Sequence, residues 1–280
     1  MKRIGFIDYY LDEWHANKYP EWIRQASGGA MEVAYAWAKT DAPNGRTNEA
    51  WSRDHGIELL SSIEKVVEQS DYLIVLSPDH PQFHEELAEL PLRSGKPTYV
   101  DKTFAPDRAA ALRLFELADK HGTPLFSSSA LRFASEYAAL EKADINAIHS
   151  IGPGAFANYS IHQIEPIVSL LGCEAERIMY TGTDKTPSWL IRFSGERQAA
   201  IHHFGGAPFS LALHYTSGKY AACKAESNFF AAFIGQLIPF FESGKSPVDP
   251  AETVAIMSII EHGFQASASP FQWIELPRGM

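Results

Sequence analysis

This sequence is poor in cysteine and in positive charge. Its 280 residues include two cysteines, Cys173 and Cys223, and neither lies in the close spacing of a zinc-binding motif. We therefore expect neither a disulfide framework nor a structural zinc site. The 24 lysines and arginines are outnumbered by 34 aspartates and glutamates, which gives a formal net charge of −10. Because the cations also form no cluster, we expect no nucleic-acid partner and no anionic membrane surface.

Long apolar runs are absent as well. No run reaches the roughly 18 residues of a membrane-spanning helix, and the apolar run that follows Met1-Lys2-Arg3 is too short for a signal peptide. We therefore expect a cytoplasmic protein. With 280 residues, of which 45% are hydrophobic, the chain is long enough for two domains.

The most informative absence is that of glycine after the first expected strand. The apolar run Ile4–Asp8 is typical of a buried parallel strand. A dinucleotide-binding domain normally continues with G-x-G-x-x-G, whose glycines let the backbone approach the pyrophosphate at the start of a helix. Residues 8–17 contain no glycine. They hold three carboxylates, which would repel a pyrophosphate, and two tyrosines, which would crowd it: Asp8, Asp12, Glu13, Tyr9 and Tyr10.

Two interpretations of this loop remain open. It is either a solvated turn whose aromatic residues pack on the core, or an altered pocket that takes a different ligand or a shifted cofactor. The pocket would be formed by Tyr9, Tyr10, Trp14 and His15. A ribose-binding carboxylate is expected roughly 20 residues past the glycines. Trp37 stands there, so the sequence does not distinguish NAD from NADP.

Two further apolar runs end in polar residues. Asp71–Leu76 is followed by Ser77-Pro78-Asp79-His80, and Pro97–Val100 is followed by Asp101-Lys102. Open parallel sheets bind ligands at the carboxyl ends of their strands. The polar residues at both ends are therefore candidates for a site.

A histidine pair near the first of these ends is a weak metal candidate. His80 and His84 are four residues apart, which would place them on one face of a helix. Pro81 suits the first turn of a helix and so places His80 at or before the helix start. We therefore expect no metal site there, and we expect His80 to face the cofactor.

The two strand ends resemble those of the Gfo/Idh/MocA oxidoreductases. In that family the first strand ends in Thr-Pro-Asn and the second in Glu-Lys-Pro, where this chain has Ser77-Pro78-Asp79 and Asp101-Lys102-Thr103. The resemblance implies that Lys102 lies near the nicotinamide of NAD or NADP and near the reacting carbon of a sugar. The residues expected to contact the cofactor are Asp8, Tyr9, Trp37, Ser77, Pro78, His80, Asp101 and Lys102.

The family pattern continues in the second half of the chain. Arg132-Phe133 matches an Arg-Phe pair at the point where the family's chain leaves its first domain, and His162 matches the histidine of a helix that carries His-x-x-Asp. Glu165 replaces the aspartate, and a spacing of three places both side chains on one helical face. A histidine beside a carboxylate can act as a general acid or base near neutral pH. The alternative is a histidine hydrogen-bonded inside the domain core. The expected substrate contacts are Arg132, Asn158 and Tyr159.

The order of the elements predicts the fold. Strands and helices alternate at first, which is typical of a Rossmann-like parallel sheet, and β-rich runs separated by turns follow Gly172, which is typical of a mostly antiparallel sheet. We predict a Rossmann-like dinucleotide-binding domain at 1–127 and an α+β substrate and oligomerisation domain at 128–280. Helices at 229–241 and 249–266 are expected to pack on the antiparallel sheet, with residues 273–276 as an edge strand. The resemblance implies a homodimer or a homotetramer.

The resemblance favours an NAD(P)-dependent oxidoreductase that transfers a hydride to or from a sugar or a polyol. In this mechanism His162 removes the hydroxyl proton, Lys102 polarises the developing alkoxide, and Glu165 orients His162. Two alternatives stay open. A non-redox small-molecule sensor with a degenerate dinucleotide site explains the missing glycines directly. An isomerase or lyase would keep Lys102 and His162 for proton transfer and dispense with the cofactor.

Overall fold

The computed structural model describes residues 1–277, which form two compact units. The first unit contains Met1–Ala105, Ala109–Ser127 and Ile234–Val248, and the second contains Pro106–Arg108, Ser128–Phe233 and the chain from Asp249 onward. The first unit is built on a parallel sheet and the second on a mostly antiparallel sheet. The predicted fold class is therefore confirmed.

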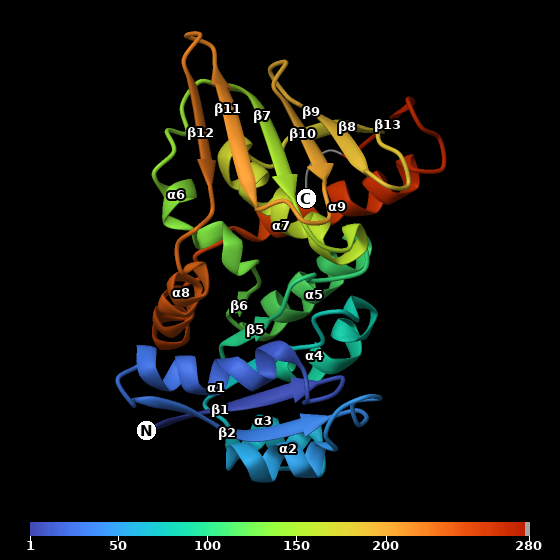
Figure 1. The fold of residues 1–280 in the computed structure, drawn as a ribbon. Helices are drawn as coiled ribbons and strands as arrows, with labels where there is room; N and C mark the ends of the chain where they lie inside the picture. The colour runs from blue at the N-terminus through green and yellow to red at the C-terminus, as the bar shows by residue number, and fades with distance from the viewer. Residues whose placement is uncertain (278–280) are drawn as a thin grey trace. The chain divides into compact units, whose positions relative to one another are not determined.

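The sheet of the first unit has six strands, each parallel to its neighbours (Figure 1). In chain order they are β1 (Lys2–Asp8), β2 (Met31–Ala38), β3 (Glu58–Leu59), β4 (Tyr72–Val75), β5 (Thr98–Val100) and β6 (Leu125–Phe126). Across the sheet the order is β3-β2-β1-β4-β5-β6. The chain direction across the sheet reverses at β1 and β4, and in such sheets ligands bind beside the carboxyl ends of the strands at this point.

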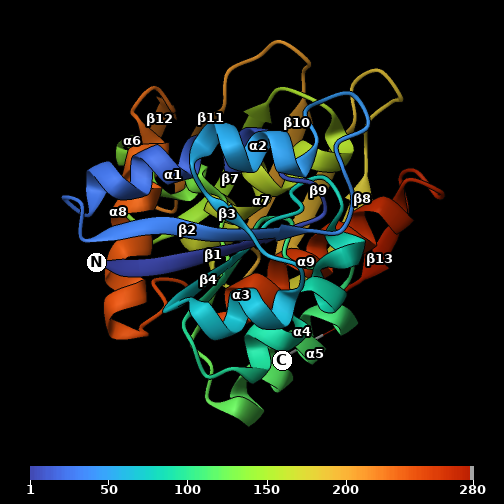
Figure 2. The ribbon, with the colours of Figure 1, turned by 90° about the horizontal axis from the view of Figure 1, so that it is seen from below.

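Helices cover both faces of this sheet. They are α1 (Trp14–Ala26), α2 (Asn48–His55), α3 (Ile63–Gln69), the 3₁₀ helix η1 (Pro81–Phe83), α4 (His84–Arg93) and α5 (Arg108–His121). Figure 2 shows α1 and α2 on one face and α3 and α4 on the other. Because both faces are covered, β4 is buried along its whole length, which explains why its sequence is apolar without alternation.

Helix α8 (Phe229–Ser243) differs from the prediction. It was expected to pack on the antiparallel sheet, but its part from Ile234 onward belongs to the first unit. There Phe241 stacks on Tyr72 of β4, with ring centroids 4.9 Å apart, and Phe240 contacts Phe126 of β6 at 5.3 Å. The prediction was wrong for this part of the helix, because an apolar helix face does not encode which sheet it covers.

The sheet of the second unit has seven strands in the order β12-β11-β7-β10-β9-β8-β13. They are β7 (Ile145–Gly152), β8 (Ala175–Tyr180), β9 (Ser188–Phe193), β10 (Gln198–His203), β11 (Ser210–Tyr215), β12 (Tyr220–Lys224) and β13 (Trp273–Glu275). The β7–β10 pair is parallel and the other pairs are antiparallel. The edge strand β13 was predicted, whereas the central strand β7 was not.

Two long helices cover one face of this second sheet. They are α7 (Phe156–Leu171) and α9 (Pro250–Ala266), which contact each other and the strands (Figure 1). The shorter segments are η2 (Ala130–Phe133) and α6 (Ser135–Ala138). Helix α9 begins where predicted, because Asp249 accepts a hydrogen bond from the Ala251 amide (2.9 Å) as its N-cap residue. Within residues 1–277, no helix has the length and apolar character that a membrane span requires.

Two glycines in helices provide opposite tests of this packing. A Cβ atom at Gly263 of α9 would lie 2.6 Å from Cε2 of the fully buried Trp189, whereas a Cβ atom at Gly235 of α8 would meet no atom within 4 Å. We predict that Gly263→Ala lowers the free energy of unfolding by about 1–3 kcal/mol through overpacking. Gly235→Ala should raise it by up to about 1 kcal/mol through helix propensity. Chemical denaturation of both variants measures this, and a Gly263→Ala protein as stable as wild type would contradict the packing.

Candidate functional site

Lys102 lies directly after β5, at the carboxyl edge of the parallel sheet. The Asp101 amide donates to the carbonyl oxygen of Val75 in β4 (2.9 Å), so strand pairing continues to Asp101. The Tyr99 hydroxyl donates to Oδ1 of Asp101 (2.8 Å). The Lys102 ammonium lies 3.9 Å from Oδ2 of Asp101 and 3.4 Å from the carbonyl oxygen of Pro78. Strand β5 therefore presents a cation, 12% exposed, that is held against Asp101 and Pro78.

The turn after β4 brings the predicted residues Ser77, Pro78 and His80 to the same edge of the sheet. Ser77 has a φ of 88°, and its hydroxyl donates to the carbonyl oxygen of His80 (3.0 Å). The His80 amide donates back to the carbonyl oxygen of Ser77 (3.1 Å). The His80 ring lies 4.9 Å from the ring of Tyr9, which stacks on Phe83 at 4.4 Å and 11°. The turn after β4 thus lies against the residue that follows β1.

Asp8 closes β1 and is almost fully buried, at 1% exposure. Its Oδ1 accepts a hydrogen bond from the Tyr9 amide (2.6 Å), and its Oδ2 has no hydrogen-bond partner among the described residues. Burial, followed by the charge of Glu13, raises the pKa of the Asp8 carboxyl well above its usual range, and Asp101 adds to the effect. The last residue of β1 is thus a buried carboxyl group that resists ionisation.

Glu13 is the N-cap residue of α1. One of its carboxylate oxygens accepts a hydrogen bond from the His15 amide (2.8 Å), and the other accepts one from the Ala16 amide. Nδ1 of His15 lies 2.9 Å from the same carboxylate. The side chains of Glu13 and His15 are only 8% and 13% exposed. The first amide donors of α1 are therefore covered by a carboxylate of the chain itself.

Arg46, which no motif in the sequence marks as a site residue, holds the same loop. Its guanidinium donates to Oδ1 of Asp12 (2.7 Å) and to Oδ1 of Asn17 (2.6 Å), and its backbone amide donates to Oδ2 of Asp12 (2.7 Å). These hydrogen bonds lower the pKa of Asp12 to about 2. Asn48 accepts a further hydrogen bond, from the Leu11 amide (3.1 Å). Asp12 and Arg46 are 34 residues apart, so no local pattern in the sequence indicates the pair.

The residues of this loop do not fit a dinucleotide pyrophosphate in its usual place. That group binds where a glycine-rich turn leaves backbone amides open at the N-terminus of a helix. Here the amides of His15 and Ala16 at the start of α1 already donate to Glu13, and residues 8–17 contain no glycine. The predicted cofactor-binding residues are thus largely brought together, but around a loop that differs from a dinucleotide site.

Two other residues, one expected to contact the cofactor and one considered as a metal ligand, lie outside these contacts. Trp37 is half-buried near the end of β2 and lies in register with Ile7 of β1. His84 is fully buried, and its Nδ1 lies 2.9 Å from the carbonyl oxygen of Phe104. Across residues 1–277, no cluster of three or more His, Cys, Asp or Glu side chains is arranged to hold a metal ion.

In the second unit, His162 and Glu165 lie on α7 and share a neighbour, Ser129. The Ser129 hydroxyl oxygen lies 2.7 Å from Nδ1 of His162, and the Ser129 amide donates to Oε2 of Glu165 (2.6 Å). The Ser128 hydroxyl donates to the other carboxylate oxygen. The run of serines is visible in the sequence, but nothing in it indicates that two of them contact α7. Ser129 connects the two residues that were predicted to act together.

Glu165 is 2% exposed and faces Arg132. Burial raises the pKa of its carboxyl to about 7, against the lowering effect of Arg132 and of the two serines. Nη1 of Arg132 lies 3.9 Å from the Glu165 carboxylate, and Nη2 donates to Glu252 of α9. The Arg132 side chain, predicted as a substrate contact, is 9% exposed and joins η2 to both α7 and α9.

The exposed side of His162 is flanked by aromatic rings. Asn158 and Tyr159 lie on the first turn of α7 and are exposed. The Tyr159 ring lies 5.3 Å from the His162 ring and parallel to Phe209 at 6.5 Å, and Phe209 lies 5.6 Å from His162. His162 is half-buried and Tyr159 is exposed, and the imidazole contacts the fully buried Ser129 on its inner side. An imidazole, a phenol hydroxyl and aromatic faces thus lie together around His162.

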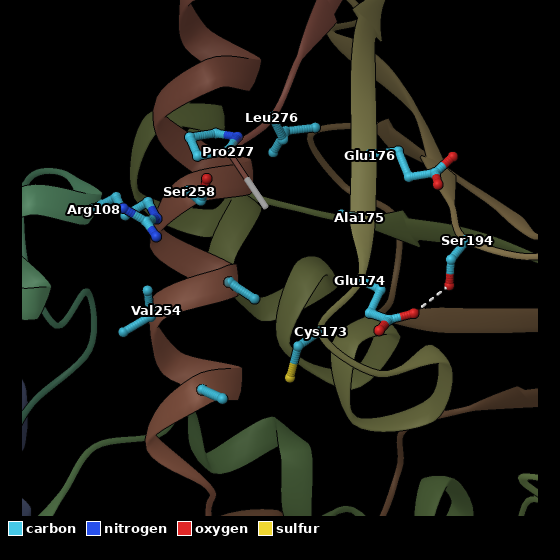
Figure 3. A pocket seen from close by; sticks show the side chains of 12 residues that line it. Arg108, Cys173, Glu174, Ala175, Glu176, Ser194, Val254, Ser258, Leu276 and Pro277 are labelled. Atoms are coloured by element: carbon cyan, nitrogen blue, oxygen red, sulfur yellow. Dashed lines mark hydrogen bonds between the residues drawn. The ribbon is translucent and has the colours of Figure 1, made fainter. Parts of the chain in front are cut away.

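A pocket of about 380 Å³ lies elsewhere in the second unit, between α9 and the start of β8 (Figure 3). Its walls include Val254 and Ser258 of α9 and the segment from Cys173 to Glu176. Burial raises the pKa of the Cys173 thiol to about 11, so this thiol stays protonated at neutral pH. None of the predicted site residues is among the described residues that line this pocket.

Comparisons of the sequence point to a known family. Residues 23–129 match the model of a family described as an oxidoreductase family with an NAD-binding Rossmann fold. The match begins after the loop at residues 8–17. Among curated proteins, the uncharacterised oxidoreductase YhhX of Escherichia coli (strain K12) is 27% identical over an alignment of 138 residues, which covers 41% of this chain and 40% of that protein. The chain therefore matches less than half the length of this relative.

Comparisons of the structure extend over the whole fold. The scyllo-inositol dehydrogenase of Lactobacillus casei, solved with bound NAD(H) and scyllo-inositol, has a TM-score of 0.78 at 13% identity, with 98% of each chain covered. The WlbA dehydrogenase of Bordetella pertussis, solved with NADH and UDP-GlcNAcA, has a TM-score of 0.77 at 14% identity, with 99% of each chain covered. At these identities the likeness shows a shared fold.

The buried Glu165 predicts a pH dependence of stability. Its pKa is raised from the usual 4.5 to about 7 in the folded chain, so between these values the folded state holds a proton that the unfolded state has lost. The stabilisation is complete below pH 4.5 and is lost as the pH rises to 7. For wild type this loss amounts to about 3 kcal/mol. Glu165→Gln, which cannot ionise, should not show it.

The measurement is urea denaturation at pH 5 and pH 8. The matched control is Glu242→Gln, which removes an exposed glutamate of α8. This control should keep the wild-type pH dependence. Parallel stability curves for wild type and Glu165→Gln would contradict the raised pKa.

Proposed function

We propose that this chain, which resembles the Gfo/Idh/MocA oxidoreductases, acts on a CH–OH group of a sugar or a polyol, and that His162 transfers the hydroxyl proton. The observation that carries this proposal is the contact between the Ser129 hydroxyl and Nδ1 of His162 (2.7 Å). A hydrogen bond at one ring nitrogen fixes the orientation of an imidazole. An oriented imidazole is a competent general acid or base near pH 7.

The surroundings of His162 also support the substrate class. Tyr159 is 40% exposed and offers a hydroxyl group as well as a ring face, and such amphipathic side chains suit ligands that are partly apolar and partly hydrogen-bonding. Two of the solved dehydrogenases with this fold are complexes, one with scyllo-inositol and one with UDP-GlcNAcA. Both lines of support favour a polyhydroxylated substrate. The predicted contacts of Asn158 and Arg132 with this substrate remain part of the proposal.

Glu165 is proposed as a positioning residue. Its carboxylate accepts a hydrogen bond from the Ser129 amide, and the Ser129 hydroxyl contacts His162. The influence of Glu165 on His162 can therefore pass through Ser129, and a change in the charge of Glu165 would alter the placement of the serine. The predicted role of Lys102, which is to polarise a substrate oxygen, is a separate proposal that concerns the first unit. The predicted homodimer or homotetramer is also a proposal.

Two reaction classes use a base of this kind. Hydride transfer to or from NAD or NADP is supported by the description of the matched family. An isomerase or lyase reaction, which needs proton transfer alone, is supported by the carboxylate of Glu13 at the N-terminus of α1. The experiment that separates them incubates the protein with inositols and aldohexoses in D₂O, with and without NAD(P). Formation of NAD(P)H identifies the first class, and product formation without cofactor, seen by proton NMR, identifies the second.

His162→Gln tests the proposed base directly. We expect kcat/KM to fall by at least about 100-fold, because general acid–base catalysis contributes a factor of about 10²–10⁴. The matched control is His214→Gln, which replaces an exposed histidine of β11 and should keep wild-type activity. A His162→Gln enzyme that retains its kcat/KM on the substrate found by the screen would refute the proposal.

Lys102→Met tests the role of the cation after β5. We expect kcat to fall by roughly 100-fold with little change in KM, because a charge that stabilises a developing alkoxide acts mainly in the transition state. Lys65→Met, which removes an exposed lysine of α3, is the matched control. An unchanged kcat in a folded Lys102→Met protein would exclude the role predicted for this lysine.

A further inference from the structure

The loop between β1 and α1 uses the chain's own side chains as acceptors for its backbone amides. The Tyr9 amide donates to Asp8, and the Leu11 amide donates to Asn48. The His15 and Ala16 amides donate to Glu13. In a dinucleotide site the amides of this loop and of the following helix turn are the donors that the phosphate oxygens accept from. Four of these donors already have an internal partner.

Glu13 also supplies the negative charge that a helix N-terminus favours. The partial positive charge at the start of α1 attracts an anion within about one turn, and the Glu13 carboxylate lies on the amides of that turn. His15 contacts the same carboxylate at 2.9 Å and follows it in the helix. A phosphate brought to these amides would have to displace Glu13 or lie against a like charge, and both are unfavourable.

The rest of the loop resists such a displacement. Asp12, next to Glu13, is held by Arg46, and Arg46 also donates to Asn17 of α1. The indole N–H of the fully buried Trp51 donates to the same oxygen of Asn17 (2.9 Å). The loop is therefore tied to α2 and to α1 at the residues that flank the cap. Moving the cap would break bonds that involve buried groups.

We infer that Glu13 takes the place of the pyrophosphate at the N-terminus of α1, so that the first unit does not bind NAD or NADP through that group. The inference concerns the first unit alone and does not depend on the substrate proposed for His162. If the loop had only lost its glycines, no single substitution would restore anion binding. If the Glu13 carboxylate fills the anion position, replacing Glu13 alone restores it.

The test uses the full chain and inorganic pyrophosphate, with NAD and NADP as further probes. Glu13→Ser keeps a hydroxyl that can cap α1 but removes the carboxylate. We expect calorimetry to detect no binding of pyrophosphate to wild type at 1 mM, which sets a lower limit on the wild-type dissociation constant. We expect the dissociation constant of the Glu13→Ser protein to lie at least tenfold below that limit. Glu13→Gln, which keeps an acceptor oxygen without the charge, serves as a second variant in case Glu13→Ser does not fold.

Glu21→Gln is the matched control, because Glu21 is an exposed glutamate of the same helix. It changes the net charge as Glu13→Gln does and should leave pyrophosphate binding at the wild-type level. Gain of binding in the Glu13 variants alone supports the inference. Two results would overturn it: wild type that binds NAD or NADP more tightly than about 100 μM in competition with pyrophosphate, or Glu13 variants that bind pyrophosphate no better than wild type.

Discussion

Hydrogen bonds from the backbone and from hydroxyl groups to buried carboxylates are the interaction on which both units depend. A carboxylate that leaves water must find donors, because an unpaired buried charge costs several kcal/mol. Glu13 accepts hydrogen bonds from the amides of His15 and Ala16. Glu165 accepts them from the Ser129 amide and the Ser128 hydroxyl. In each case the carboxylate fixes the backbone segment that supplies the donors, so the positions of a few acidic residues determine the shape of the loops at the candidate sites.

The same interaction has opposite consequences in the two units. In the first, it removes donors from the start of α1, where an anionic ligand would otherwise bind. In the second, it places the Ser129 hydroxyl 2.7 Å from Nδ1 of His162, so a buried carboxylate orders the neighbour of a half-buried histidine. Asp12 follows the first pattern, since Arg46 and its amide satisfy both of its oxygens. A Rossmann-like sheet can therefore be retained while the loop that defines its usual ligand is rebuilt.

The parts of the structure that the sequence predicts are those set by local patterns. Strand β2 has the predicted bounds, Met31–Ala38, because eight neighbouring residues carry its β-rich pattern. Strand β7 was missed because Asn146, His149 and Ser150 interrupt its apolar positions, and its burial depends on strands that follow it in the chain. The site contacts were missed for the same reason at longer range: Ser129 and His162 are 33 residues apart, and Arg132 and Glu252 are 120 apart. Nothing local in the sequence specifies such pairs.

The link through Ser129 also limits what a pH profile of activity can reveal. The pKa of Glu165 lies at about 7 because burial opposes its ionisation, and the range near pH 7 is also where histidines commonly titrate. Ionisation of Glu165 strengthens its attraction for the Ser129 amide, and the hydroxyl of that serine contacts His162. A transition near neutral pH would therefore belong to the coupled group and not to one residue. Only a transition that persists in Glu165→Gln and disappears in His162→Gln assigns the proton to the imidazole.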